Sequence, residues 1–137
     1  PGHTIDFDAI ERKLTPNVRV VYIQKSKGYQ DRPTLTSAEI GKICEFVKSR
    51  KPEVWVMVDN CYGEFTEEHE PTYYGADLIV GSMIKNVGGG LAKIGGYLAG
   101  KHELVEKCAA RMTMPGVGRE SGATLNTLQD FYQGLFL

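Results

Sequence analysis

Apolar and polar positions along the chain alternate between two periods, one typical of strands and one typical of helices. Short apolar or β-branched runs bounded by turn residues predict four strands, at residues 18–23, 54–58, 78–80 and 96–100. The run over 54–58 is apolar at odd and even positions alike, which predicts a central strand covered by helices, since an edge strand would show alternation.

Apolar residues at helical spacing predict four helices, at about residues 6–14, 36–50, 102–112 and 120–136. The second has the clearest boundaries. Thr36 and Glu39 have the spacing of a capping box, and Pro52 requires the helix to end shortly before it. A polar stretch from Gln24 to Pro33 precedes this helix, and long loops of this kind are often functional.

Strands that alternate with helices predict an α/β fold with a largely parallel sheet. Ligands in such sheets bind at the carboxyl ends of the strands. Asp59 and the loop that starts at Gln24 both lie at such ends. The pattern therefore predicts a binding site that brings these two segments together.

Composition narrows the function classes. The 137 residues fit a single domain, and a net charge of −1 predicts no binding to nucleic acid or to an anionic membrane surface. Cys44, Cys61 and Cys108 are odd in number and widely spaced, which favours a reducing, cytoplasmic setting. The chain starts at Pro1 without a methionine and ends on the apolar residues 134–137, so we expect a piece of a longer protein, with a small complete domain as the alternative.

Two polar residues each follow an apolar run, Asp59 after the second predicted strand and Lys85 after the third. An enzyme that uses pyridoxal 5'-phosphate needs such a pair: an amine for a Schiff base and a carboxylate that keeps the pyridine nitrogen protonated. A lysine nucleophile must lose its proton, which partial burial near positive charge promotes. Alternatively, Asp59 is a structural turn residue and Lys85 a solvated surface lysine.

Neighbours of Lys85 suit a phosphate. Ser82 offers a hydroxyl, and the glycines at 88–90 permit close approach of the backbone. Two nucleotide-binding motifs do not match the glycine-rich stretches. Residues 90–97 lack the Lys-Ser/Thr of a P-loop, and residues 116–122 are one residue too long for GxGxxG. The three histidines match no metal-ligand spacing, and no GxSxG is present, so neither a metal site nor a serine nucleophile is predicted.

Several sequence blocks occur together in one order, and together they resemble a known family. These blocks are Val58–Tyr62, Tyr74–Ile79, Gly81–Asn86 and Gly95–Gly100, with Ile84–Ala92 and Gly116–Ala123 in addition. From about Ile5 onward the chain resembles the Cys/Met-metabolism group of fold-type I pyridoxal phosphate enzymes. Within that group it is most similar to the methionine γ-lyase-like family, often labelled aluminium resistance protein.

The resemblance implies a role for each matched residue. Lys85 would be the Schiff-base lysine and then the base that removes the substrate Cα proton, and Asp59 would pair with the pyridine nitrogen. Ser82 would bind the cofactor phosphate. Tyr62 resembles the tyrosine that some fold-type I enzymes aim at the ring oxygen of the cofactor, although packing in the core is an equal alternative.

The resemblance also implies a three-layer α/β sandwich and a carbon–sulfur lyase that acts on a sulfur-containing amino acid by β- or γ-elimination. The chain would be the central portion of the large domain. The amino-terminal phosphate loop, the ring-stacking aromatic and the carboxyl-terminal arginine of the family cannot be placed within it. A second subunit would complete the site, which implies a homodimer or homotetramer. A same-fold aminotransferase and a cofactor-free α/β interaction domain remain alternatives.

The family pattern also has departures in this chain. The better-known γ-lyases carry a short Ser-Pro-x-Asn stretch where this chain has residues 24–32, and the asparagine has no counterpart here. Ile84 stands just before the lysine, where many relatives have a second hydroxyl for the phosphate. Both differences bear on the choice of substrate.

Overall fold

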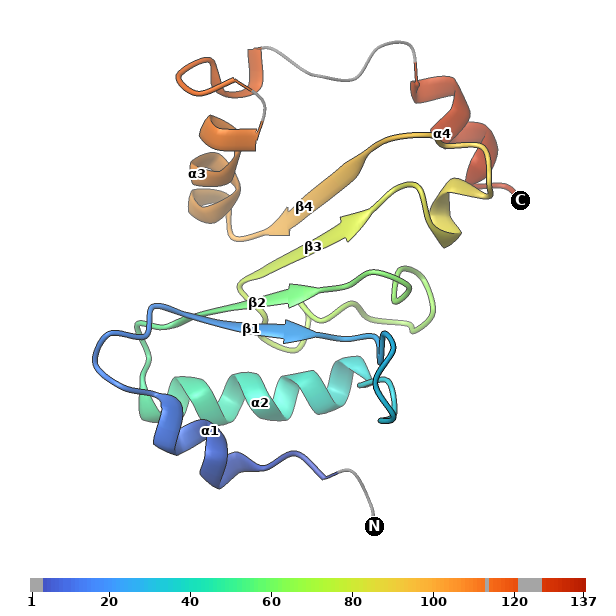
Figure 1. Cartoon of the computed structure of the whole chain (residues 1–137). Helices are drawn as coiled ribbons and strands as arrows, with labels where there is room; N and C mark the ends of the chain where they lie inside the picture. The colour runs from blue at the N-terminus through green and yellow to red at the C-terminus, as the bar shows by residue number, and fades with distance from the viewer. Residues whose placement is uncertain (1–3, 113, 121–126) are drawn as a thin grey trace.

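One four-stranded sheet organises the chain in the computed structural model, which describes residues 4–112, 114–120 and 127–137 (Figure 1). The strands are β1 (Val20–Gln24), β2 (Trp55–Asp59), β3 (Leu78–Ser82) and β4 (Gly96–Gly100). The helices are α1 (Phe7–Lys13), α2 (Ser37–Arg50), α3 (His102–Met112) and α4 (Leu128–Gly134), with 3₁₀ turns η1 (Asn86–Gly88) and η2 (Gly118–Glu120).

The strands lie in the order β1-β2-β3-β4, with β2 in the interior as predicted. The first three are mutually parallel, and β4 runs antiparallel to β3. The register aligns Gln24 with Asp59, and Asp59 with Val80. The α/β class with a mostly parallel sheet is therefore confirmed, and the carboxyl ends of the three parallel strands meet at one edge.

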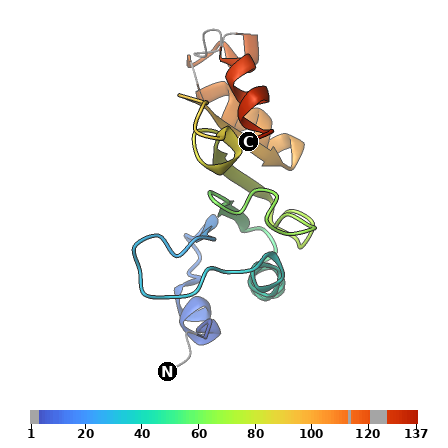
Figure 2. The same ribbon diagram turned by 90° about the vertical axis from the view of Figure 1, so that its right-hand side faces the viewer.

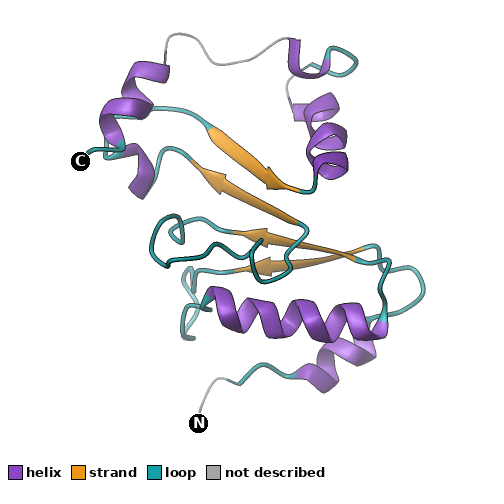
Figure 3. Ribbon diagram, turned by 180° about the vertical axis from the view of Figure 1, so that it is seen from behind, coloured by secondary structure: helices purple, strands orange, loops and turns teal. Residues whose placement is uncertain are grey.

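Helix α2 covers one face of the sheet and begins as its sequence predicts. The Thr36 side chain accepts from the Glu39 backbone N–H at 3.1 Å, and the Glu39 carboxylate accepts from the Thr36 N–H at 2.8 Å. The apolar side of the helix packs on the sheet in one buried cluster, which contains Ile23, Ile40, Ile43, Cys44, Val47, Val54, Val56, Val58, Ala76 and Ile79. Figure 3 shows α2 lying along β1 and β2.

The opposite face of the first two strands is open. Val56 and Val58 are buried against α2, but Trp55 and Met57 on the other face of β2 are only partly buried. Tyr22 is 53 % exposed on the neighbouring β1. Figures 1 and 2 place α3 and α4 beyond β4, at the far end of the sheet from α1 and α2. The described helices therefore leave this face of β1 and β2 accessible.

Element boundaries agree with the sequence prediction except near the carboxyl end. The predicted helix over 102–112 is confirmed with those bounds. Of the helix predicted over 120–136, only Leu128–Gly134 is confirmed, because Glu120 lies in a 3₁₀ turn and residues 121–126 lie outside the described part. Among the described residues, no helix has the length and apolar character needed to cross a bilayer.

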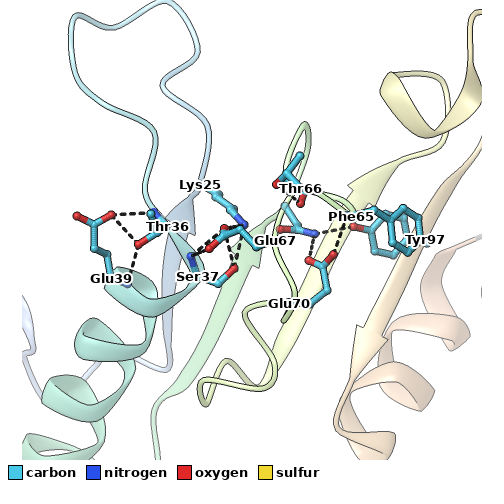
Figure 4. A network of polar contacts seen from close by, with 11 residues as sticks. Lys25, Thr36, Ser37, Glu39, Phe65, Thr66, Glu67, Glu70 and Tyr97 are labelled. Atoms are coloured by element: carbon cyan, nitrogen blue, oxygen red, sulfur yellow. Dashed lines mark hydrogen bonds and ion pairs between the residues drawn. The ribbon is translucent and has the colours of Figure 1, made fainter.

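A buried lysine, Lys25, connects three segments of the chain through polar contacts (Figure 4). Lys25, 2 % exposed, follows β1 and places its Nζ 2.6 Å from Glu67 Oε1 and 2.9 Å from Ser37 Oγ. Glu67 also accepts from the backbone N–H of Ser37, the first residue of α2. Because a buried ammonium requires such partners, this network fixes the loops that follow β1 and β2 against the start of α2.

Replacing Lys25 with methionine should destabilise the protein by about 3 kcal/mol, because Glu67 would lose its cationic partner. The loss should be at the low end for a buried ion pair, because Glu67 stays partly hydrated. Lys27→Met is the matched control, because Lys27 is exposed two residues away. Chemical denaturation of both variants measures the difference. Equal stability of the two variants would contradict this role of Lys25.

The same network makes stability depend on pH. Burial raises the pKa of Glu67, but hydrogen bonds from Lys25 and Ser37 outweigh burial and leave the pKa below its ordinary value. Its contribution is therefore present above the unfolded-state pKa of a glutamate and is lost as pH falls through the lower folded-state value. Melting temperatures between about pH 6 and pH 3 should fall less steeply for Glu67→Gln than for the unmodified protein.

Candidate active site

An open cleft of about 720 Å³ lies at the carboxyl edge of the parallel strands. The end of β1 and the loop after it form one side, and the residues that follow β2 and β3 form the other. Its lining includes Gln24, Tyr29, Asp59, Cys61, Tyr62 and Lys85. The structure therefore brings together the two segments that the sequence predicted and three of the four predicted site residues.

Asp59, the last residue of β2, is held at both carboxylate oxygens. Oδ1 accepts from the Cys61 backbone N–H at 3.0 Å, and Oδ2 accepts from the Tyr22 hydroxyl at 3.0 Å. Burial raises the pKa of this carboxyl, but hydrogen bonds from Cys61 and Tyr22 and the charge of Lys85 outweigh burial and leave the pKa below its ordinary value. Asp59 is therefore ionised at neutral pH.

Lys85 follows β3 and enters the same cleft. Its Nζ lies 5.0 Å from the centre of the Tyr62 ring, a cation–π distance. A hydrogen bond to the Cys61 thiol raises the pKa of Lys85, burial lowers it, and the charge of Asp59 raises it further, so the net shift is upward. This corrects the lowered pKa expected from the sequence: the groups around this amine favour its charged form.

Tyr62 lies at the rim of the cleft. Its side chain is 53 % exposed, so it does not pack in the core that the described residues form. Its backbone adopts a left-handed conformation with φ 68°, which is uncommon for a residue other than glycine. This conformation accompanies the placement of the ring beside Lys85.

Ser82 and the glycine stretch lie differently from expectation. Ser82 ends β3, and its Oγ accepts from the Ile84 N–H at 3.4 Å, but it is not among the residues that line the cleft. Its contact with a phosphate stays a prediction. The close approach expected at the glycines occurs to protein backbone: a Cβ on Gly89 would overlap the carbonyl oxygen of Gly134 in α4. In this structure, Gly88 and Gly89 lie against the backbone of α4.

Two further residues belong to the site, and the residue-by-residue reading of the sequence did not single them out. Tyr22 lies on the same face of the sheet as Asp59. Alternation of side chains along two aligned parallel strands would have indicated this, but the sequence does not give the register of the strands. Cys61 lies in a turn, donates its backbone N–H to Asp59 and lines the cleft together with Lys85. No sequence signal marks its orientation, because turn geometry decides it.

Comparison with known proteins assigns the family. The profile of the family described as methionine gamma-lyase matches residues 2–137. The chain belongs to this family. An uncharacterised Bacillus subtilis protein is 55 % identical over 133 residues, which are 97 % of this chain and 32 % of the relative. An L-methionine gamma-lyase of Treponema denticola is 26 % identical over 131 residues, 96 % of this chain and 30 % of that enzyme.

A solved structure from Listeria innocua, named as a candidate cystathionine beta-lyase involved in aluminium resistance, is 52 % identical. The alignment covers all of this chain and 34 % of that one, with a TM-score of 0.92. The resemblance to the methionine γ-lyase-like and aluminium resistance proteins, with their fold-type I architecture, is thus confirmed. The chain spans about a third of the length of these relatives.

Gly89→Ala should destabilise the protein more than Gly90→Ala. Both glycines have a left-handed backbone, φ 54° and 75°, which costs an alanine about 1–2 kcal/mol. Only Gly89 faces the backbone of α4, whereas a Cβ on Gly90 meets nothing within 4 Å. The difference in melting temperature between the variants isolates the overlap with Gly134, and equal values would contradict the packing described.

Proposed function

We propose that this chain is the cofactor-binding centre of a pyridoxal 5'-phosphate-dependent carbon–sulfur lyase that cleaves a sulfur-containing amino acid by β- or γ-elimination. The observation that carries the proposal is the placement of an ionised Asp59 and the Lys85 amine in one cleft at the carboxyl edge of the sheet. Membership of the methionine gamma-lyase family supports the class of reaction.

The donor set fits this cofactor at its pyridine and aldehyde ends. Asp59 is a carboxylate kept ionised by neighbouring donors, as pairing with a protonated ring nitrogen requires. Lys85 carries the amine that the aldehyde needs, and Tyr62 presents an exposed ring and hydroxyl beside it. When bound, pyridoxal phosphate supplies the sink for the electrons left when a substrate Cα proton departs.

Lys85 must change its protonation state to act. Its amine is stabilised as an ammonium by Cys61, Tyr62 and Asp59, so covalent attachment to the aldehyde requires the loss of a proton from Nζ. Once released from the aldehyde, the neutral Nζ would accept the substrate Cα proton and later deliver it to the departing product. Asp59 would remain ionised throughout and hold the orientation of the ring.

Other parts of the enzyme would complete the site. We propose that Ser82 contacts the phosphate once the remaining segments are in place, and that this chain is the central portion of a large cofactor-binding domain. The chain's span of about a third of its relatives is consistent with such a portion. A second subunit in a homodimer or homotetramer would contribute the rest of the site. The free thiols of Cys44, Cys61 and Cys108 are consistent with a reducing, cytoplasmic location.

The direct test is to add pyridoxal phosphate to the full-length protein and record the absorbance spectrum. A visible band that marks covalent attachment to a lysine should form, and Lys85→Ala should abolish it. Lys27→Ala is the matched control, because Lys27 lines the same cleft but lies on the loop after β1. This control should keep the band.

The absence of a band in the full-length protein would overturn the proposal and favour a cofactor-free α/β domain. A band that survives in Lys85→Ala would refute the role of this lysine. Product analysis then separates the reactions: a lyase releases a thiol, a keto acid and ammonia, whereas a same-fold aminotransferase exchanges an amino acid for a keto acid.

A further inference from the structure

Tyr22 lies on the open face of the sheet and makes one side-chain hydrogen bond within the described residues. Its hydroxyl donates to Asp59 Oδ2 at 3.0 Å. The side chain is 53 % exposed, so packing alone does not account for its orientation. A hydrogen bond to a charged acceptor is stronger than one between neutral groups.

The sheet register places this hydroxyl at the carboxylate. Tyr22 is aligned with Met57, two residues before Asp59 on the adjacent strand. Alternation puts Tyr22 and Asp59 on the same face, and a diagonal neighbour of this kind lies within reach of a long aromatic side chain. The backbone on both strands is fixed by ladder hydrogen bonds, and the Lys25 N–H adds another by donating to the Asp59 carbonyl at 3.0 Å.

We propose that Tyr22 is a positioning residue for Asp59, which orients this carboxylate toward the cofactor ring and keeps it ionised. The inference rests on the proposed function. With the Cys61 N–H on Oδ1 and the Tyr22 hydroxyl on Oδ2, each oxygen has one fixed donor, and its remaining lone pairs are free for the cleft. Tyr22 acts through Asp59 and needs no contact with the substrate.

The electrostatics agree with this arrangement. Burial raises the pKa of Tyr22, and its hydrogen bond to Asp59 raises the pKa further, so the hydroxyl stays a proton donor at neutral pH. The same bond is among the causes that lower the pKa of Asp59. Without it, Asp59 would protonate at a higher pH and lose the charge that pairs with a protonated ring nitrogen.

The test compares Tyr22→Phe with Tyr132→Phe in the full-length protein, using pyridoxal phosphate as the probe. Tyr132 lies in α4, is 66 % exposed and does not line the cleft, so its variant controls for the loss of a hydroxyl. Tyr22→Phe should weaken binding about tenfold or more, as removal of supporting residues around a bound group commonly does. The affinity of Tyr22→Phe should also begin to fall at a higher pH as the solution is made more acidic. Tyr132→Phe should change neither the affinity nor its pH dependence.

A second comparison separates positioning from a structural role. In an Asp59→Asn background, where the charge is absent, adding Tyr22→Phe should cause little further loss and no pH shift. An equal additional loss in both backgrounds would overturn the inference. So would unchanged affinity and pH profile in Tyr22→Phe when the unmodified protein binds normally. Failure of the unmodified protein to bind the probe would instead overturn the proposed function, and the inference with it.

Discussion

Parallel pairing between β1 and β2 aligns Gln24 with Asp59, and the geometry of the cleft depends on that register. Both strands end at the same edge, so the loop after β1 begins beside the carboxylate that ends β2. Helix α2 buries the apolar side of this pair, and burial of Val56 and Val58 there directs the alternate residues, Tyr22 and Asp59, to the open face. A slip of one residue would exchange the two faces.

Two residues of the cleft are held in their charged forms. The Cys61 backbone N–H and the Tyr22 hydroxyl each bind one oxygen of Asp59 and favour its anion, and the groups around Lys85 favour its ammonium. In the proposed function, this state would suit the binding of a protonated ring, because Asp59 is already an anion. It would oppose nucleophilic attack by Lys85, whose proton must leave first. Binding of the cofactor and its covalent attachment would then need different protonation states of Lys85.

Local signals predicted the regular elements well. The capping box at Thr36 and the apolar spacing that follows it located α2 within a residue, since a capped amphipathic helix is determined by contacts three and four residues apart. The helix over 102–112 was located equally well. The sequence predicted that the glycines at 88–90 approach a phosphate, and that contact stays a prediction. In the structure Gly88 and Gly89 approach the distant Gly134, which no local pattern indicates.

The sequence by itself determined the fold class, the central position of β2 and the candidates Asp59 and Lys85, because apolar periodicity and strand ends are local properties. The tertiary structure decided which candidates share a cleft, that Cys61 lines it and Ser82 does not, and that the Tyr22 hydroxyl binds Asp59. It also reversed the expected pKa shift of Lys85. These outcomes depend on strand register and turn geometry, which bring residues up to 61 positions apart, from Gln24 to Lys85, into the wall of one cleft.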